Sequence, residues 1–325
     1  MAIEVIRPGL ATSVQDLGRP GYYHLGIPES GGMDRYALRA ANLLTGNAET
    51  DAVLEVTFQG PELRFTKDAL VAVTGAELPP KVEGKARSTW AAFTVRAGQV
   101  LAFDFLKRGA RAYIAVAGGI DVPLVLGSRS TYALGGLGGY KGRRLQAGDV
   151  LPVREATRAT REGREVPEQL RCSFPAVTEL RVLAGLYDFR VTKAALDGFF
   201  ADTWRVATEA DRIGYRFRGG RAMEFVPRTQ PFGAGSNPSN IVDTCYPYGS
   251  IQIPGGTEPI VLHRDAVSGG GYFMIGTVIS ADMDRIGQMQ PHAQGRFVRV
   301  DMAAALTARR AAAERTASLR RSLLA

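Results

Sequence analysis

The chain has 325 residues, 45% of them hydrophobic and 22% charged, which is typical of a globular protein with two domains. No apolar run approaches the roughly 18 residues that span a bilayer, and two cysteines are too few for a disulfide framework. Half of the net charge of +8 lies in residues 302–325, so the rest of the surface is too weakly basic to predict nucleic-acid binding. We see no secretion signal and expect a cytoplasmic protein.

The first distinctive segment, residues 14–34, combines many glycines with polar side chains. Glycine lets a ligand or another chain approach the backbone closely. Alanine and leucine then recur at helical spacing after Asp34, which can accept backbone N–H groups at the start of a helix, and Gly46 suits the left-handed residue after its end. A pair of ordinary turns before a helix stays open as an alternative. Four side chains of the segment could contact a ligand: Gln15, Asp16, Arg19 and Asp34.

The next hundred residues read as short alternating strands with a turn about every ten residues, which favours a barrel or sandwich over a parallel α/β sheet. Val95–Phe103 predicts two strands folded about a turn, and Arg111–Ala117 predicts a buried strand. The latter leads into Gly-Gly, then proline and three aliphatic residues, and the strand at Ile251 is followed by the same order. This repeated sequence pattern indicates two related barrels.

Residues 154–172 are charged and poor in large apolar side chains, so they predict a linker between the halves. We therefore expect an N-terminal domain at 1–160 and a C-terminal domain at 172–325. The C-terminal domain should open with a strand near Leu180 and end in a helix at Met302–Leu324.

Several chemistries find no support in the sequence. The three histidines have no metal-ligand spacing, so we expect no metal site, and no Gly-x-x-x-x-Gly-Lys-Ser/Thr phosphate loop is present. Gly-x-Ser-x-Gly is also absent, and Gly233-Ala234-Gly235-Ser236 predicts a flexible loop.

Polar residues beside glycines are the remaining candidates. Carboxylates could serve as general bases or as partners of an arginine, and the candidates are Asp16, Asp34 and Asp265. Guanidinium, amide and phenol groups could bind a small planar substrate, and the candidates are Gln15, Arg19, Arg212, Tyr215, Gln252 and Tyr272. The alternative is that these charges form structural ion pairs, Asp16 with Arg19, Arg264 with Asp265, and Arg212 with Asp211 or Asp243.

Two blocks near the N-terminus resemble the allophanate hydrolase subunit 2 family. They are Gln15-Asp16 with Gly18-Arg19, and Gly-x-Met-Asp-x-x-Ala-Leu-Arg-x-Ala-Asn-Leu-Leu-x-Gly-Asn over residues 31–47. Further matching blocks follow in order at 111–131, 212–216, 249–254, 259–262, 270–272 and 281–282. The family includes the C subunit of the ATP-dependent 5-oxoprolinase and half of the carboxyltransferase domain of urea carboxylase. The resemblance implies a mainly β (α+β) fold of two cyclophilin-like β-barrel domains with helical additions.

The same resemblance implies a subunit of a heteromeric ATP-dependent amidohydrolase complex that opens a cyclic amide such as 5-oxoproline. Its partners would be an allophanate hydrolase subunit 1-like chain, which resembles the B subunit of 5-oxoprolinase, and a lactam-utilisation chain, which resembles its A subunit. The complex would use ATP. One alternative is a carboxyltransferase subunit served by biotin on a separate carrier, since no Ala-Met-Lys-Met is present. Another is a non-catalytic regulator that binds a kinase-inhibitor partner chain.

The sequence departs from the family pattern in the second half. Asp265-Ala-Val-Ser-Gly-Gly-Gly-Tyr272 stands where the family has Asp-x-Gln-Thr-x-Gly-Gly-Tyr, and His263-Arg264 replaces a smaller or amide-bearing pair. A substrate other than 5-oxoproline therefore stays open.

Overall fold

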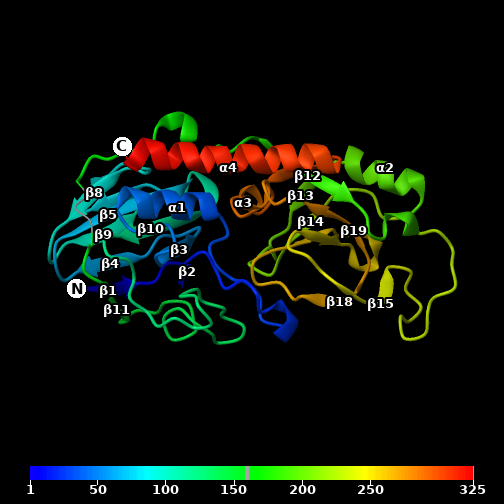
Figure 1. Ribbon diagram of the computed structural model, residues 1–325, viewed down its shortest axis with the longest axis horizontal. Helices are drawn as coiled ribbons and strands as arrows, with labels where there is room; N and C mark the ends of the chain where they lie inside the picture. The colour runs from blue at the N-terminus through cyan, green and yellow to red at the C-terminus, as the bar shows by residue number, and fades with distance from the viewer. Residues whose placement is uncertain (158–160, 325) are drawn as a thin grey trace. The chain divides into compact units, whose positions relative to one another are not determined.

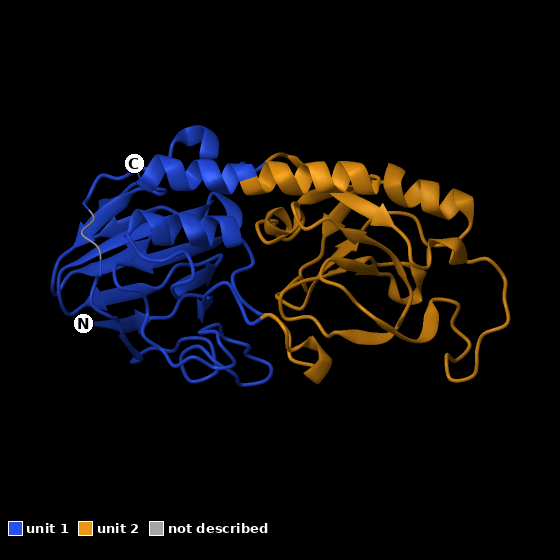
Figure 2. Ribbon diagram, in the orientation of Figure 1, with its two compact units in different colours: residues 1–19, 30–174, 314–325 blue, residues 20–29, 175–313 orange. Residues whose placement is uncertain are grey.

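A computed structural model describes residues 1–157 and 161–324, and the chain divides into two compact units (Figures 1 and 2). Unit 1 comprises residues 1–19, 30–174 and 314–325, and unit 2 comprises residues 20–29 and 175–313. Residues 158–160 of the expected linker lie outside the described part of the chain. The domain boundaries expected from the sequence stay a prediction.

Unit 1 contains two β-sheets. The first has the strand order β11-β1-β4-β9-β6-β7, and the second has the order β2-β3-β10-β5-β8. The strands of the first sheet are β1 (Ala2–Arg7), β4 (Glu62–Phe65), β6 (Pro80–Val82), β7 (Lys85–Ala86), β9 (Val100–Phe103) and β11 (Val150–Pro152). The strands of the second sheet are β2 (Ala11–Gln15), β3 (Val53–Thr57), β5 (Ala69–Glu77), β8 (Ala92–Val95) and β10 (Arg108–Val116). A 3₁₀ turn, η2, covers Glu168–Leu170.

The second sheet is buried on both faces because successive side chains of a strand point to opposite sides. On β10, Ile114 packs with Phe65 and Leu101 of the first sheet, while Tyr113 packs with Leu38 of helix α1 (Arg35–Leu44). Figure 1 shows α1 lying along this sheet. Burial on both faces explains why the strand reads as a continuous apolar run.

Helix α1 begins and ends as the sequence predicts. The Asp34 carboxylate accepts a hydrogen bond from Ala37 N at 2.9 Å, and Gly46 has φ +76°. Both features satisfy backbone groups that a helix leaves unpaired at its ends.

The turn expected within Val95–Phe103 is present, because Gln99 N donates to Arg96 O at 3.0 Å. Its two strands, however, do not pair with each other. β8 pairs with β5 in the second sheet, and β9 pairs with β4 in the first. The turn therefore carries the chain between the two sheets, and the implied hairpin was wrong because long-range pairing overrides the local turn.

Unit 2 contains a closed seven-stranded barrel, with the order β12-β19-β16-β17-β14-β13-β20. β20 lies parallel to β12 and antiparallel to β13, so it closes the ring. The barrel strands are β12 (Val177–Ala184), β13 (Trp204–Val206), β14 (Gly214–Arg218), β16 (Ser250–Gln252), β17 (Ile260–Leu262), β19 (Met274–Val278) and β20 (Gln294–Arg299). Other elements are the ribbon of β15 (Asn240–Cys245) and β18 (Gly269–Tyr272), helices α2 (Lys193–Ala201) and α3 (Met283–Ile286), and the turns η1 (Tyr23–Leu25), η3 (Asp188–Arg190) and η4 (Pro254–Gly256).

Helix α4 (Met302–Leu324) has the bounds that the sequence predicts, and the mainly β class with a C-terminal helix is confirmed. Residues of α4 up to 313 belong to unit 2 and those from 314 to unit 1 (Figure 2). None of the described helices combines the length and apolar character needed to cross a lipid bilayer.

A buried ion pair fastens β12 to the segment before α3. Asp282 is fully buried, and its carboxylate accepts hydrogen bonds from Arg181 N, Nε and Nη2 at 2.9, 2.8 and 2.6 Å. The carboxylate therefore holds both the backbone and the side chain of one barrel strand. Removing one partner of such a pair leaves the other charge unpaired where water cannot fully solvate it.

We predict that Asp282→Ala lowers the free energy of unfolding by about 3 kcal/mol, because three hydrogen bonds to a buried carboxylate are lost. Urea unfolding followed by circular dichroism measures the change. Asp197→Ala is the control, since its pair with Lys193 on α2 is largely exposed and should contribute about 0.5 kcal/mol or less. Equal losses in the two variants would contradict the prediction.

Candidate functional site

The Asp16 carboxylate accepts four hydrogen bonds at the end of β2. Oδ1 accepts from Ser128 Oγ at 2.6 Å, Ser130 Oγ at 2.5 Å and Gly18 N at 2.8 Å, and Oδ2 accepts from Arg129 N at 2.5 Å. The carboxylate is also buried, with 6% of its residue surface exposed. Its hydrogen-bonding capacity is thus largely used in joining two loops of unit 1, which favours a structural role. The predicted role as a general base stays a prediction.

Gln15 and Arg19 flank this carboxylate and are buried too. Gln15 Nε2 donates to Ser13 Oγ at 3.0 Å and Thr131 O at 3.1 Å, whereas Gln15 Oε1 has no hydrogen-bond partner within the described residues. Arg19 donates through Nη2 to Ser130 O and through Nε to Val125 O at 3.4 Å. Both side chains are therefore held in place, and Gln15 presents an acceptor that the described chain does not use.

Ser30 is a residue that the sequence reasoning missed. It is fully buried with φ +55°, a conformation that non-glycine residues adopt at a cost, and its Oγ has no hydrogen-bond partner among the described residues. The segment around it lies against the Asp16 loop, since Gly32 N donates to Asp16 O at 2.9 Å. A Cβ on Gly31 would lie 2.7 Å from Gly18 N, so this close approach requires glycine. Ser30 therefore combines a strained backbone with a buried hydroxyl that the described chain does not use.

Asp34 belongs to a second buried network in unit 1. The Tyr113 hydroxyl donates to Glu55 Oε2 at 2.8 Å and accepts from Asp34 N at 2.7 Å, and Cys172 Sγ lies 3.5 Å from Asp34 Oδ2. Burial, with added repulsion from the carboxylate of Glu55, raises the pKa of Tyr113 well above its usual value. Tyr113 therefore stays a neutral hydroxyl that orients its neighbours, and Asp34 acts here as a helix cap.

In unit 2, two predicted site residues form one ion pair. Arg212 Nε donates to Asp265 Oδ2 at 2.8 Å and Nη2 donates to Asp265 Oδ1 at 3.1 Å. Asp211, one of the alternative partners, instead accepts from Ile213 N and Gly214 N. The planar fork that suits a substrate carboxylate is thus occupied by a carboxylate of the chain itself. Substrate binding by Arg212 and catalysis by Asp265 stay predictions.

Next to this pair, His263 is fully buried and hydrogen-bonded through both ring nitrogens. Nδ1 accepts from Arg264 N at 3.0 Å, and Nε2 donates to Met283 O at 3.1 Å, which fits the neutral ring. The Arg264 guanidinium stacks 4.1 Å from the centroid of the Tyr248 ring. His263 therefore serves to join β17 to α3.

The three other predicted substrate contacts in unit 2 fall into two places. Tyr215 is buried, and its hydroxyl donates to Gly287 O at 3.5 Å, so its ring is part of the barrel interior. The Tyr246 hydroxyl donates to Tyr272 O at 2.7 Å and also bonds with the Gln252 side chain. Gln252 is buried, whereas Tyr272 is 42% exposed and the most accessible of the three.

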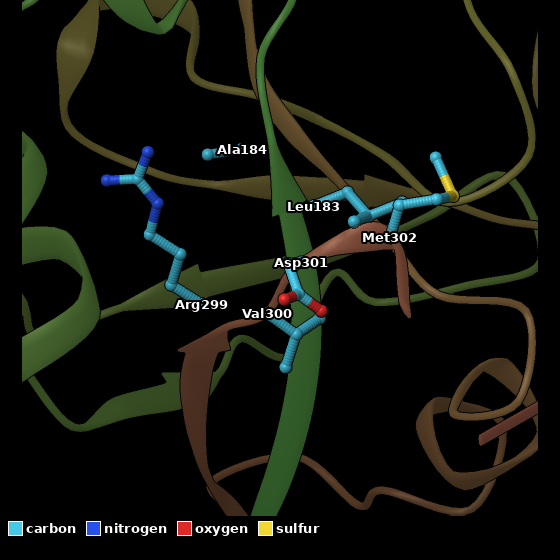
Figure 3. A pocket seen from close by; sticks show the side chains of 6 residues that line it. All are labelled: Leu183, Ala184, Arg299, Val300, Asp301 and Met302. Atoms are coloured by element: carbon cyan, nitrogen blue, oxygen red, sulfur yellow. The ribbon is translucent and has the colours of Figure 1, made fainter. Parts of the chain in front are cut away.

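A cavity of about 490 Å³ opens between β12 and the start of α4. It is lined by Leu183, Ala184, Arg299, Val300, Asp301 and Met302 (Figure 3), none of which the sequence singled out. Asp301 already accepts a hydrogen bond from Ala304 N at 2.8 Å. The cavity thus lacks a convergent set of polar groups, and we do not assign the site to it. Within residues 1–157 and 161–324, no cluster of three or more histidine, cysteine or acidic side chains could hold a metal ion.

Residues 25–299 match the family described as "Carboxyltransferase domain, subdomain A and B". The chain is 35% identical to the 5-oxoprolinase C subunit of Escherichia coli (strain K12) over 94% of each chain. It is also 35% identical to urea amidolyase of Saccharomyces cerevisiae, over 91% of this chain and 16% of that protein. The solved urea amidolyase of K. lactis superimposes with a TM-score of 0.91 at 32% identity, over 98% of this chain and 20% of that one. The chain thus spans only a small part of the urea amidolyases.

We predict that Asp16→Asn lowers the free energy of unfolding by about 2–4 kcal/mol. Both carboxylate oxygens accept hydrogen bonds, so the amide NH₂, which can only donate, would replace an acceptor and face N–H or O–H donors. Chemical denaturation measures the change. Asp121→Asn, which alters an exposed carboxylate of the same unit, should have an effect within about 0.5 kcal/mol. Unchanged stability in Asp16→Asn would contradict the structural role.

Proposed function

Because the chain belongs to the carboxyltransferase domain family, we propose that it is a subunit of a heteromeric ATP-dependent amidohydrolase complex that opens a cyclic amide such as 5-oxoproline. The match to the 5-oxoprolinase C subunit over 94% of both chains carries this proposal. A match along nearly all of both chains constrains function more tightly than a match to one part of a longer protein.

A lactam such as 5-oxoproline offers one N–H, one carbonyl oxygen and one carboxylate. In unit 1, Gln15 Oε1 would accept the lactam N–H, and Ser30 Oγ would donate to the lactam oxygen. Both atoms are buried without a hydrogen-bond partner among the described residues. A substrate that satisfies them would relieve a desolvation penalty of about 1–3 kcal/mol for each group.

A positively charged side chain would bind the carboxylate of the substrate. Arg19 lies in the loop that follows Gln15, the last residue of β2, with its guanidinium already oriented by two backbone carbonyls. The residues that the sequence marked in unit 2, Arg212, Tyr215, Gln252 and Tyr272, stay predictions, since each already has a partner within that unit.

The proposed catalytic carboxylates all have structural partners. Asp16 accepts four hydrogen bonds, Asp34 caps α1, and Asp265 holds Arg212. We therefore propose that the reaction is completed only in a complex with two partner chains, which resemble the B and A subunits of 5-oxoprolinase. In that complex, ATP would activate an amide carbonyl that is otherwise resistant to water.

The glycine-rich segment 135–139 does not fit a nucleotide. A Cβ on Gly138 would overlap Ser130 O, and one on Gly139 would overlap Thr131 Oγ1, so the backbone of this segment packs against the chain itself. A phosphate-binding loop instead leaves its backbone N–H groups facing the ligand. This segment therefore carries no ATP site in our proposal, and ATP is used through the complex as a whole.

A second candidate function is the transfer of a carboxyl group from biotin on a separate carrier to a urea-like substrate. The observation that favours it is the TM-score of 0.91 with a urea amidolyase over 98% of this chain. The two candidates differ in the substrate and in the cofactor that the partners bring.

We predict that this chain, assembled with both partner chains, hydrolyses ATP in response to 5-oxoproline and shows no turnover alone. In the complex, Ser30→Ala should lower kcat/KM at least about tenfold, since one hydrogen bond to substrate is worth about 1.4 kcal/mol. Its unfolding free energy should stay within about 1 kcal/mol of the parent, because no described partner is lost. Coupled assays of ADP and glutamate measure the activity.

Thr74→Val is the matched control. Thr74 is equally buried, but its hydroxyl donates to Ala37 O at 2.7 Å, so the variant should lose about 1 kcal/mol of stability and keep its kcat/KM. Activity that requires urea, bicarbonate and a biotin carrier would support the second candidate instead. Full activity in Ser30→Ala would contradict the assignment of Ser30.

A further inference from the structure

Unit 2 contains a buried arginine that neither candidate function uses. Arg190, at the end of η3, is 3% exposed. Its Nη2 donates to Pro238 O at 2.8 Å and Asn240 O at 3.0 Å. Its Nε and Nη1 are buried without a hydrogen-bond partner within the described residues. Burying guanidinium N–H donors without an acceptor costs free energy, and buried donors in proteins normally form hydrogen bonds.

The charge of Arg190 is also uncompensated. Within residues 1–157 and 161–324, no carboxylate forms an ion pair with it. The backbone brings Arg228 near, because Val226 N donates to Arg190 O at 2.9 Å, and the exposed Arg228 side chain donates to Gln230 Oε1 at 3.1 and 2.6 Å. Burial lowers the pKa of the Arg190 guanidinium, and the positive charge of Arg228 lowers it further. A bound anion would therefore stabilise these two neighbouring guanidinium groups.

We propose that Arg190 and Arg228 bind a small oxyanion, a carboxylate or a phosphate group. The anion would accept a hydrogen bond from the unused Nη1 or Nε of Arg190, and its charge would offset both guanidinium groups. Nη2 of Arg190 stays with the carbonyls of Pro238 and Asn240, which fix the direction of the remaining donors. The site uses neither residue of the Arg212–Asp265 pair, and the proposal does not depend on the proposed function.

The segment from Arg228 to Pro238 lies beside this site, since Pro238 O accepts from Arg190 Nη2. Gln230 Nε2 donates to Asn237 O at 2.5 Å, which closes a loop containing the fully exposed Phe232. Gly233 and Gly235 have φ of +87° and +69°, and a Cβ on either would meet little or nothing. The glycines of this loop therefore face open space.

Isothermal titration calorimetry of the full chain with inorganic phosphate and with acetate, at ionic strength balanced with NaCl, tests the proposal. We expect saturable binding of at least one anion to the parent protein. Arg228→Gln should weaken it at least about fivefold, and Arg190→Met should abolish it. Arg310→Gln, which removes an exposed arginine of α4, should bind like the parent. Binding of phosphate but not of acetate would indicate that the site takes a phosphate group. Binding of both would indicate that the site accepts either kind of oxyanion.

Circular dichroism checks that Arg190→Met is folded, and if it is not, Arg228→Gln decides the question. The proposal is overturned if the parent shows no saturable binding of either anion. It is also overturned if Arg228→Gln binds as tightly as Arg310→Gln, because Arg228 would then play no part.

Discussion

The buried carboxylate of Asp16 is the interaction on which the candidate site of unit 1 depends. Through its two oxygens it draws the loop after β2 onto residues 128–130, which are distant in sequence. Its backbone carbonyl also accepts from Gly32 N, so the same residue positions the segment that carries Ser30. Carboxylates with several hydrogen bonds inside a protein are strongly held, because each donor left unpaired would carry a desolvation cost. This anchor helps to place Arg19 and Ser30, whereas Gln15 is held by the pairing of β2 with β3.

The groups best suited to receive a ligand are those whose bonding capacity is not already used. The three acidic residues that the sequence suggested as catalytic all hold structural hydrogen bonds, whereas Gln15 Oε1 and Ser30 Oγ have none among the described residues. In unit 2, Arg190 likewise has buried groups that no described residue bonds with. These are the donors Nε and Nη1 of a charged guanidinium, whereas Gln15 Oε1 is a neutral acceptor. In both units, the proposed ligand contacts are buried groups whose hydrogen-bonding capacity the described chain leaves unused.

Features set by neighbouring residues could be predicted from the sequence. The Asp34 cap, helix α4 and the buried strand β10 follow from local spacing and propensity, and all three are present. Features set by distant residues could not. The turn at Gly98 does not indicate that β8 and β9 belong to different sheets. The sequence also offers several acidic partners for Arg212 and does not indicate that Asp265 is the one it pairs with. The strain at Ser30 and the unused Nε and Nη1 donors of Arg190 become visible only when the whole fold is known.

The most direct test of the central claim is a crystal structure of the assembled complex with 5-oxoproline bound. We predict that Gln15 Oε1 and Ser30 Oγ lie within about 3.2 Å of the lactam N–H and oxygen, respectively. The Asp16 carboxylate should keep its hydrogen bonds with Ser128 and Ser130. A substrate bound directly to the Asp16 carboxylate, with both serines displaced, would contradict this account.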